Sequence, residues 1–106
     1  MTQLWEILVP THDNDGKKIR LSHHHEWDSK VESLCGGLTI LKAAKGRWRH
    51  KGKLFAEKMI PVRIVCSKVQ IEVIAKLTQL HYKQIQVMYF LVSEQVMFYP
   101  NDIEKD

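Results

Sequence analysis

Apolar residues first gather in a short run over residues 4–9, which predicts a largely buried strand. From Ser22 onward they recur at every third or fourth position instead, which predicts a first helix over about residues 22–35. Ser22 is a favourable helix-capping residue, and Gly36 and Gly37 can adopt the positive φ that ends a helix. The chain therefore opens with a strand and a helix.

The longest pattern is a two-residue alternation over residues 54–66, which follows a short strand predicted at residues 38–41. Pro61 lies inside this alternation and predicts an edge position or a bulge there. One side of the strand would carry Leu54, Ala56, Ile60, Val62, Ile64 and Cys66, with Lys58 as the exception, and the other side Phe55, Glu57, Met59, Pro61, Arg63 and Val65.

A capping box begins the last third of the chain, because Ser67 is followed three residues later by Gln70. Apolar residues at helical spacing then predict a second helix that ends near Tyr82. Residues 84–92 are rich in β-favouring residues and predict a strand. After a turn, residues 96–99 predict a short last strand.

This order of elements predicts a single domain over residues 1–106, of the α+β class. Each helix has one apolar stripe to bury, so both are expected on one face of an antiparallel sheet, in a ferredoxin-like βαββαβ sandwich with an extra C-terminal strand. Residues 85–92 include apolar residues at both odd and even positions, so both faces of that strand need to be buried against other parts of the protein. Two helices cover only one face. We therefore expect the other face to contact a second copy of the chain in a homo-oligomer.

Composition adds few constraints. The chain is 44% hydrophobic and 26% charged, as in ordinary folded domains. No apolar run is long enough to span a membrane, and the first residues lack the pattern of a secretory signal, so we expect a cytoplasmic protein without membrane contact. Cys35 and Cys66 are then expected to be reduced and buried.

Positive charge is concentrated in one segment. Six of the 16 lysines and arginines lie between residues 42 and 53, a segment that also holds Trp48 and is expected to form a loop or hairpin. Such a stripe suits phosphate binding, with Trp48 as a stacking surface, although a merely solvated hairpin would look the same. The glycine-bearing aromatic signature of sheet-face RNA-binding modules is absent, so nucleic acid is not the expected partner.

The histidines and acids do not predict a metal site. His23, His24 and His25 are consecutive, so on a helix they point in directions about 100° apart and cannot all bind one ion. Residues 13–16 begin like a calcium loop, but lysines follow where a carboxylate is needed, which indicates an ordinary turn. We therefore expect no metal site and no cofactor.

Glu57 and Arg63 share the side of the long strand that faces away from the core. Six residues separate them, about 20 Å along a strand, so they cannot pair with each other within it. Each is expected to meet a partner from a neighbouring chain. That partner would make Glu57 a base or ligand-binding group tuned by partial burial, or would make either residue one half of a surface ion pair.

Several motifs resemble those of a family of small uncharacterised bacterial proteins. They are Gly36-Gly37-Leu38-Thr39, Gly46-Arg47-Trp48, Glu57 and Ile60-Pro61-Val62-Arg63-Ile64. The resemblance runs from about Leu4 to Tyr99 and implies no established activity.

Residues 47–99 also resemble the phage S-adenosylmethionine lyases, most clearly at residues 62–66 and in the helix after them. This resemblance implies a small oligomeric domain with its active site between subunits, and it places Glu57 near the family's functional glutamate. Trp48 stands where that family has a tyrosine, so an acidic hydroxyl is replaced by a ring that can still stack on adenine. The architecture is also similar to that of trimeric PII-type signalling proteins, which bind nucleotides between subunits.

Three functions remain open on these grounds. The first is a homo-oligomer, trimer before dimer, that binds a small nucleotide-like or anionic ligand at the subunit interface. The second is an enzyme of the S-adenosylmethionine-lyase type with Glu57 as its catalytic residue. The third is an adaptor that binds nucleic acid or protein through residues 42–53. The residues leave open whether any reaction is catalysed.

For the first function, the expected ligand-binding residues are Gly37, Thr39, Arg47, Trp48, Arg49 and Arg63, together with Glu57. Gly37 and Thr39 would offer backbone and hydroxyl contacts, and Trp48 a stacking face. The arginines would meet an anionic group, and Glu57 would bind a polar or cationic one.

Overall fold

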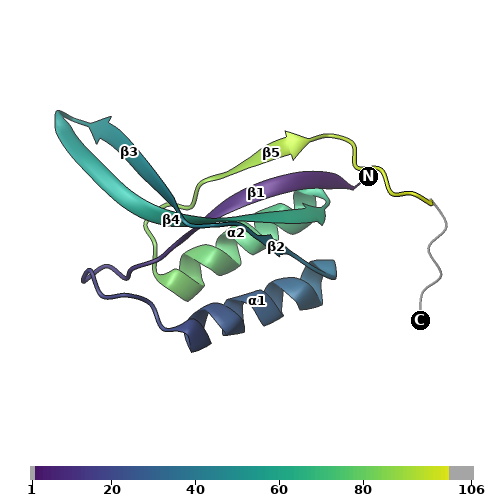
Figure 1. Cartoon of the computed structure of the whole chain (residues 1–106), viewed down its shortest axis with the longest axis horizontal. Coiled ribbons are helices and arrows are strands. Elements are labelled where there is room, and N and C mark those ends of the chain that lie inside the picture. Colours follow the sequence, from purple (N-terminus) through teal and green to yellow (C-terminus); the bar gives the residue numbers. More distant parts are fainter. Residues whose placement is uncertain (1, 101–106) are drawn as a thin grey trace.

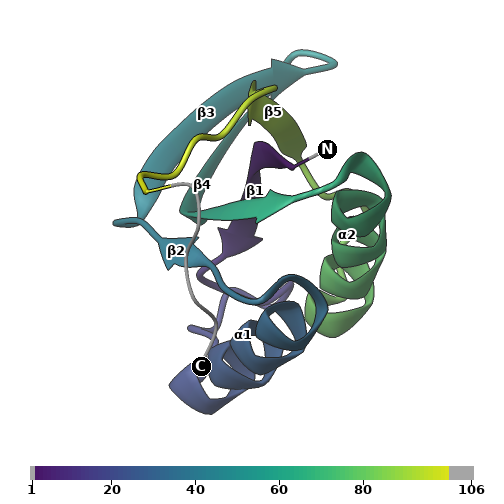
Figure 2. The same ribbon diagram turned by 90° about the vertical axis from the view of Figure 1, so that its right-hand side faces the viewer.

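Two helices lie side by side on one face of a five-stranded antiparallel sheet, and the part of the chain that the structure describes leaves the other face open (Figure 1, Figure 2). The computed structural model describes residues 2–100. In chain order the elements are β1 (Gln3–Pro10), α1 (Leu21–Cys35), β2 (Thr39–Ile40), β3 (Ala44–His50), β4 (Lys53–Cys66), α2 (Lys68–Tyr82) and β5 (Tyr89–Ser93). The predicted α+β class is confirmed.

β4 is the central strand of the sheet. It pairs with β1 along residues 59–66, and its other edge pairs first with β3 and then with β2. β5 lies on the far side of β1, so the strand order is β2-β4-β1-β5, with β3 beside β4 and beyond the end of β2. This is a ferredoxin-like βαββαβ arrangement in which the second strand is divided into β2 and β3.

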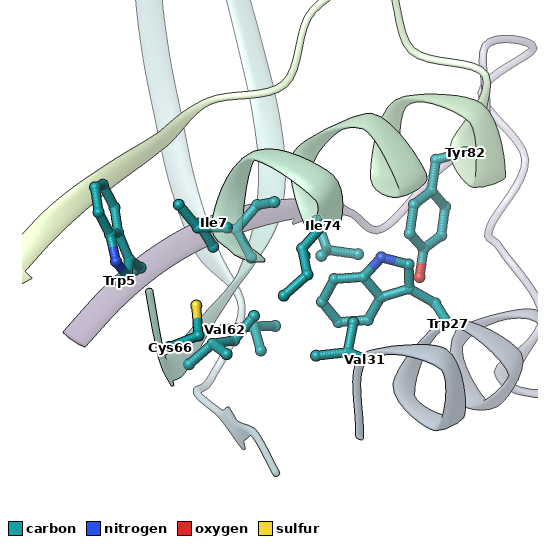
Figure 3. Close-up of a cluster of buried hydrophobic side chains, with 11 residues drawn as sticks. Trp5, Ile7, Trp27, Val31, Val62, Cys66, Ile74 and Tyr82 are labelled. Atoms are coloured by element: carbon teal, nitrogen blue, oxygen red, sulfur yellow. The ribbon is translucent and has the colours of Figure 1, made fainter. Parts of the chain in front are cut away.

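The predicted alternation along β4 is confirmed where that strand runs beneath the helices. Val62 and Ile64 are buried opposite Ile7 and Trp5 of β1. The core also contains Val9 and Cys66 from the sheet, Trp27 and Val31 from α1, and Ile71, Ile74 and Tyr82 from α2 (Figure 3). Leu54, at the other end of β4, is exposed because the strand there has passed beyond the helices.

The helix ends follow the predicted chemistry except at the start of α1. Ser67 Oγ accepts a hydrogen bond from the Gln70 amide at 3.2 Å and Gln70 Oε1 accepts one from the Ser67 amide at 2.9 Å, so the predicted capping box is confirmed. Gly36 ends α1 with φ of 87°. The expected cap at Ser22 is wrong, because α1 begins at Leu21 and Ser22 lies inside its first turn. Each of the two described helices is too short and too polar to cross a lipid bilayer.

The strands at the C-terminal end differ from the prediction. β5 begins only at Tyr89, because residues 84–88 connect the end of α2 to the sheet. The first hydrogen bond between this segment and β1 is the one that the Leu8 amide donates to the Met88 carbonyl at 3.1 Å. Residues 96–99 do not form the expected extra strand, and Met97 and Tyr99 in that segment are largely exposed. β2 is likewise only two residues long where four were predicted.

Pro61 lies within the sheet and not at its edge, so of the two predicted alternatives the bulge is confirmed: the pairing with β4 shifts by one residue between Ile40–Val62 and Ala44–Met59. β4 has neighbours on both sides there, but Pro61 falls at the gap between β2 and β3. The Leu41 amide donates to the Pro61 carbonyl at 2.9 Å. Because Pro61 has no N–H to return that bond, the ladder is interrupted where one neighbouring strand ends and the next begins.

The two helices are joined by buried polar bonds as well as by apolar packing. Trp27 Nε1 donates to Thr78 Oγ1 at 3.0 Å, and the Thr78 hydroxyl donates to the Ile74 carbonyl at 2.6 Å. Tyr82 Oη lies 2.7 Å from His24 Nδ1. Burial lowers the pKa of His24 and raises the pKa of Tyr82, so at neutral pH the phenol donates to an uncharged imidazole.

Both cysteines are free, as predicted. Cys66 is buried as predicted, whereas Cys35 is only half-buried and packs against the edge of the core. Burial raises the pKa of both thiols, that of Cys66 to about 12, so both stay protonated at neutral pH.

Replacing Thr78 by valine should lower the free energy of unfolding by about 1–3 kcal/mol. Valine keeps the shape of threonine but leaves the indole N–H of Trp27 buried without an acceptor. Urea unfolding followed by circular dichroism measures this change. Ser33→Ala is the matched control, because the Ser33 hydroxyl makes the same type of bond to a carbonyl four residues back, but on an exposed surface. Its effect should stay within about 0.5 kcal/mol, and equal losses in both variants would contradict the prediction.

Candidate ligand-binding site

β3 and the first half of β4 form a hairpin that extends past the helices (Figure 1). Lys51 and Gly52 form its two-residue turn with φ of 49° and 77°, the positive values that a type I′ turn requires. The hairpin is built from the basic segment, so the prediction of a loop or hairpin over residues 42–53 is resolved in favour of the hairpin.

Strand pairing places the side chains of the hairpin on two different faces, because residues paired across antiparallel strands point to the same side. One face carries the pairs Gly46–Glu57 and Trp48–Phe55. The other carries the pairs Lys45–Lys58, Arg47–Ala56 and Arg49–Leu54. We call these the aromatic face and the basic face. Trp48 and Glu57 are thus brought together, whereas Arg47 and Arg49 lie on the opposite side of the ribbon.

The aromatic face offers a flat surface next to a carboxylate. The Trp48 and Phe55 rings are nearly parallel, with centroids 5.9 Å apart and an angle of 13° between the planes. Gly46 leaves the indole uncovered on one side, and Lys53 Nζ lies 5.4 Å from the Phe55 ring centre. Trp48 remains 44% exposed. A planar ring can therefore stack on this face within reach of Glu57.

A cavity of about 360 Å³ also involves Glu57. Its walls are the loop after β1 (residues 10–14), residues 56–59 of β4 and the end of α2. Hydrogen bonds hold these walls together: the Thr11 hydroxyl donates to the Lys58 carbonyl at 3.0 Å, and Asn14 Nδ2 donates to the Lys83 carbonyl at 2.9 Å. Glu57 is therefore one of the residues around the cavity, while strand pairing places its side chain on the aromatic face.

Gln84, just after α2, carries an unpaired side-chain oxygen close to this cavity. It is one of the lining residues, and its Oε1 atom is buried without a hydrogen-bond partner among residues 2–100. A buried amide oxygen normally has a partner, so Gln84 Oε1 is an exception among the described residues.

The other expected site residues lie at the far end of β4. Thr39 pairs with Arg63, and six residues of strand, about 20 Å, separate them from Glu57. Gly37 precedes β2 at the same end. Arg63 Nε donates to Glu6 Oε1 at 3.1 Å, so its acidic partner comes from β1 of the same chain and not, as expected, from a neighbour. Sequence reasoning missed Glu6 because the register between β1 and β4 is set by tertiary packing.

The site residues of one chain thus form two groups. The aromatic face supplies a stacking surface and a carboxylate, and the Thr39–Arg63 end supplies a hydroxyl and a guanidinium. The cavity residues beyond Glu57 were also missed. Residues 13–16 were correctly predicted as a turn, in which Asp13 Oδ1 accepts from the amides of Asp15 and Lys17. Turn chemistry does not indicate, however, that the loop lines a cavity.

Comparison with known proteins gives a likeness in structure only. No protein-family model matches the sequence, and no curated protein matches it. Among solved structures, the divalent cation tolerance protein CutA1 from Thermus thermophilus is 10% identical, with a TM-score of 0.63 over 91% of this chain and 88% of its own. The periplasmic divalent cation tolerance protein CutA from Archaeoglobus fulgidus is 10% identical, with a TM-score of 0.68 over 93% and 89%.

A phage S-adenosylmethionine lyase solved in complex with S-methyl-5′-thioadenosine is also similar. It is 14% identical, with a TM-score of 0.66 over 87% of this chain and 81% of its own. The resemblance to phage lyases is thus confirmed at the level of the fold. The expected uncharacterised family is not what the comparison finds, because its neighbours are CutA1 proteins, which sequence reasoning did not anticipate. The chain therefore has the fold that CutA1 proteins and the phage lyase share.

Proposed function

We propose that the chain forms a homo-oligomer, trimer before dimer, and binds a small nucleotide-like or anionic ligand between subunits. The observation that carries this proposal is the aromatic face, where Trp48 lies flat on Phe55 beside Glu57. An adenine ring stacks on such a surface at little conformational cost. The Glu57 carboxylate then accepts hydrogen bonds from amino or hydroxyl groups, or attracts a cationic group of the ligand.

The open face of the sheet supports assembly. Phe90 lies opposite Glu6 on this face, and Phe90 and Val92 are each 38% exposed. Clustered apolar side chains on an otherwise bare sheet face are typical of a subunit interface. Burying this face against another copy supplies the cover that two helices cannot provide.

The two groups of site residues favour a ring over a dimer. The aromatic face and the Thr39–Arg63 end are different surfaces about 20 Å apart along β4. If one group meets the other group of the next chain without the reciprocal contact, the contact is heterologous, and heterologous contacts whose rotation closes form rings. A trimer is the smallest such ring and creates three equivalent clefts.

The basic face accounts for the anionic part of the proposal. Lys45, Arg47, Arg49 and Lys58 are exposed, and within residues 2–100 none of them forms an ion pair. In an oligomer these cations meet a phosphate or carboxylate of the ligand held by the adjacent chain. If the partner is a polyanion instead, the same face is the whole site and binding falls steeply with salt.

An S-adenosylmethionine lyase is the second candidate, and the position of Glu57 favours it. Two acids, Asp13 and Glu57, are among the residues around the cavity, and of these Glu57 also lies beside the stacking rings. The phage lyase of the same fold was solved with an adenosine thioether. In this reading Glu57 holds or deprotonates the substrate, and the ligand is consumed.

Ligand binding should depend on the stacking ring of Trp48. S-adenosylmethionine, adenine nucleotides and simple anions are tested by thermal shift, and a ligand at about 100 times its dissociation constant adds about 2.7 kcal/mol of stability. Trp48→Ala should weaken binding by about 5- to 150-fold, the equivalent of a stacking energy of about 1–3 kcal/mol. Trp48→Phe keeps a ring and should retain most of the affinity.

Mass analysis of each mixture separates a binding protein from an enzyme. An intact ligand supports binding alone. A consumed ligand supports the lyase, and Glu57→Gln should then abolish turnover while the protein stays folded. If no compound shifts the melting temperature, this choice of ligands is wrong. A macromolecular partner on the basic face is then tested with Arg47→Ala and Arg49→Ala.

Assembly should depend on the open face of the sheet. Light scattering after gel filtration should give the mass of a trimer, and Phe90→Lys should shift the protein toward the monomer by placing a charge in the interface. Leu80→Lys is the matched control, because Leu80 is 68% exposed on α2, away from that face. A monomeric parent protein, or equal effects of both variants, would contradict the proposed interface.

A further inference from the structure

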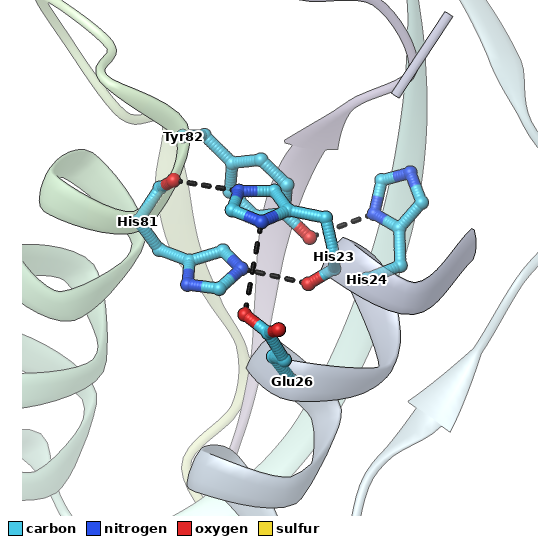
Figure 4. A network of polar contacts seen from close by, with 5 residues as sticks. All are labelled: His23, His24, Glu26, His81 and Tyr82. Carbon is cyan, nitrogen blue, oxygen red and sulfur yellow. Dashed lines mark hydrogen bonds and ion pairs between the residues drawn. The ribbon is translucent and has the colours of Figure 1, made fainter. Parts of the chain in front are cut away.

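A histidine–glutamate cluster joins the start of α1 to the end of α2 on the helical side of the molecule (Figure 4). His23 and Glu26 come from α1 and His81 from α2. One ring nitrogen of each histidine and one carboxylate oxygen of Glu26 all lie within 4.8 Å of one another. The His23 side chain is 41% exposed and that of Glu26 65%, so the cluster is open to ions from solvent.

Helix geometry explains why these three residues meet. His23 and Glu26 are three positions apart and therefore share one face of α1. The imidazoles of His23 and His81 stack at 3.9 Å with 15° between their planes. His24 points instead to Tyr82, and His25 is exposed. Only one of the three consecutive histidines therefore takes part, which agrees with the steric argument made from the sequence.

The hydrogen bonds of His23 leave one of its nitrogens free to bind a metal ion. Nε2 of His23 lies 2.9 Å from the His81 carbonyl oxygen, and a carbonyl can only accept, so Nε2 carries the proton. The lone pair of the neutral ring then resides on Nδ1, which lies 3.8 Å from Glu26 Oε2. A ring held through its second nitrogen by a backbone carbonyl is the usual arrangement of a metal-binding histidine.

His81 makes the matching bond, with Nε2 donating to the His23 carbonyl at 2.7 Å. Its lone pair therefore lies on Nδ1. To bind an ion, His81 can give up the hydrogen bond from Nε2 to the His23 carbonyl and coordinate the ion through Nε2. Alternatively, its ring can turn so that Nδ1 faces the ion. His23 and Glu26 thus form the preorganised part of the site, and His81 joins on binding.

We propose that His23, Glu26 and His81 bind a divalent transition-metal ion such as Zn²⁺. Two imidazole nitrogens and one carboxylate oxygen suit Zn²⁺, Ni²⁺ or Cu²⁺ and not the harder Mg²⁺ or Ca²⁺. Three protein ligands leave at least one position for water, because the cluster faces solvent. The ion would cross-link the two helices. The site differs from that of the proposed function in residues and location, so neither depends on the other.

Isothermal titration of the untagged full chain with ZnCl₂ tests the proposal and should show one ion per chain. Losing even an outer-shell partner of a metal site costs about 10- to 100-fold in affinity. His23→Gln, Glu26→Gln and His81→Gln should therefore each weaken binding at least about tenfold. Glu26→Gln is the most informative variant, because the Glu26 side chain is 65% exposed and its replacement by an amide of the same shape should leave the fold intact.

His25→Gln is the matched control, since His25 lies on the same helix but outside the cluster. It should leave the affinity unchanged. Titration with Co²⁺ distinguishes this site from the Cys35–Cys66 thiol pair, because thiolate ligands would add a strong near-ultraviolet charge-transfer band. The absence of binding, a thiolate band, or affinities unchanged by Glu26→Gln and His23→Gln would each overturn the proposal.

Discussion

The two-residue alternation of β4 is the constraint on which both the core and the candidate site depend. A slip of one residue would move Val62 and Ile64 to the open face and bring Arg63 into the core. Both ends of the strand are held against such a slip. The type I′ turn fixes the register with β3 at one end, and the Ser67–Gln70 capping box starts α2 directly after the other. The register that buries the core thus also places Glu57 beside Trp48.

The hairpin is the part of β4 that the helices do not cover, so local interactions must hold it together. An isolated two-stranded ribbon is marginal in water, and the Trp48–Phe55 pair offsets this by about 0.5–1.5 kcal/mol. Lys45 directly opposite Lys58 has the reverse effect, because like charges across a strand pair repel. The basic face therefore opposes the stability of its own hairpin, and a bound anion would relieve that repulsion.

Local chemistry predicted what is local in the fold. The capping box at Ser67, the end of α1 at Gly36 and the alternation of β4 each depend on a few neighbouring residues, and each is confirmed. The extra strand at residues 96–99 failed because strand propensity does not by itself supply a partner strand. The predicted start of α1 was wrong because Ser22 was chosen for its capping preference alone, whereas the loop before the helix places Arg20 at the N-cap position.

The candidate site was predictable only in part, for a related reason. Glu57 and Arg63 were correctly assigned to the side of β4 away from the core, because parity follows from the sequence. The basic segment also alternates, since Lys45, Arg47 and Arg49 lie on one face of the strand and Trp48 on the other. This assignment to faces can be made only once the segment is known to be a strand. The Glu6–Arg63 pair and the contact between His23 and His81 depend on pairings across more than fifty residues, which no local pattern contains.

The proposed site, divided along one strand, would couple ligand binding to assembly. A ligand the size of a mononucleotide cannot span the roughly 20 Å from Glu57 to Arg63 in one chain, so one that contacts both groups would lie between two chains. Ligand and assembly then stabilise each other by the same factor, because linkage between binding equilibria is reciprocal. The histidine cluster joins the two helices, on the opposite side of the sheet from the proposed interface. An ion bound there would stabilise the fold of each chain independently, since distant sites without shared partners act additively.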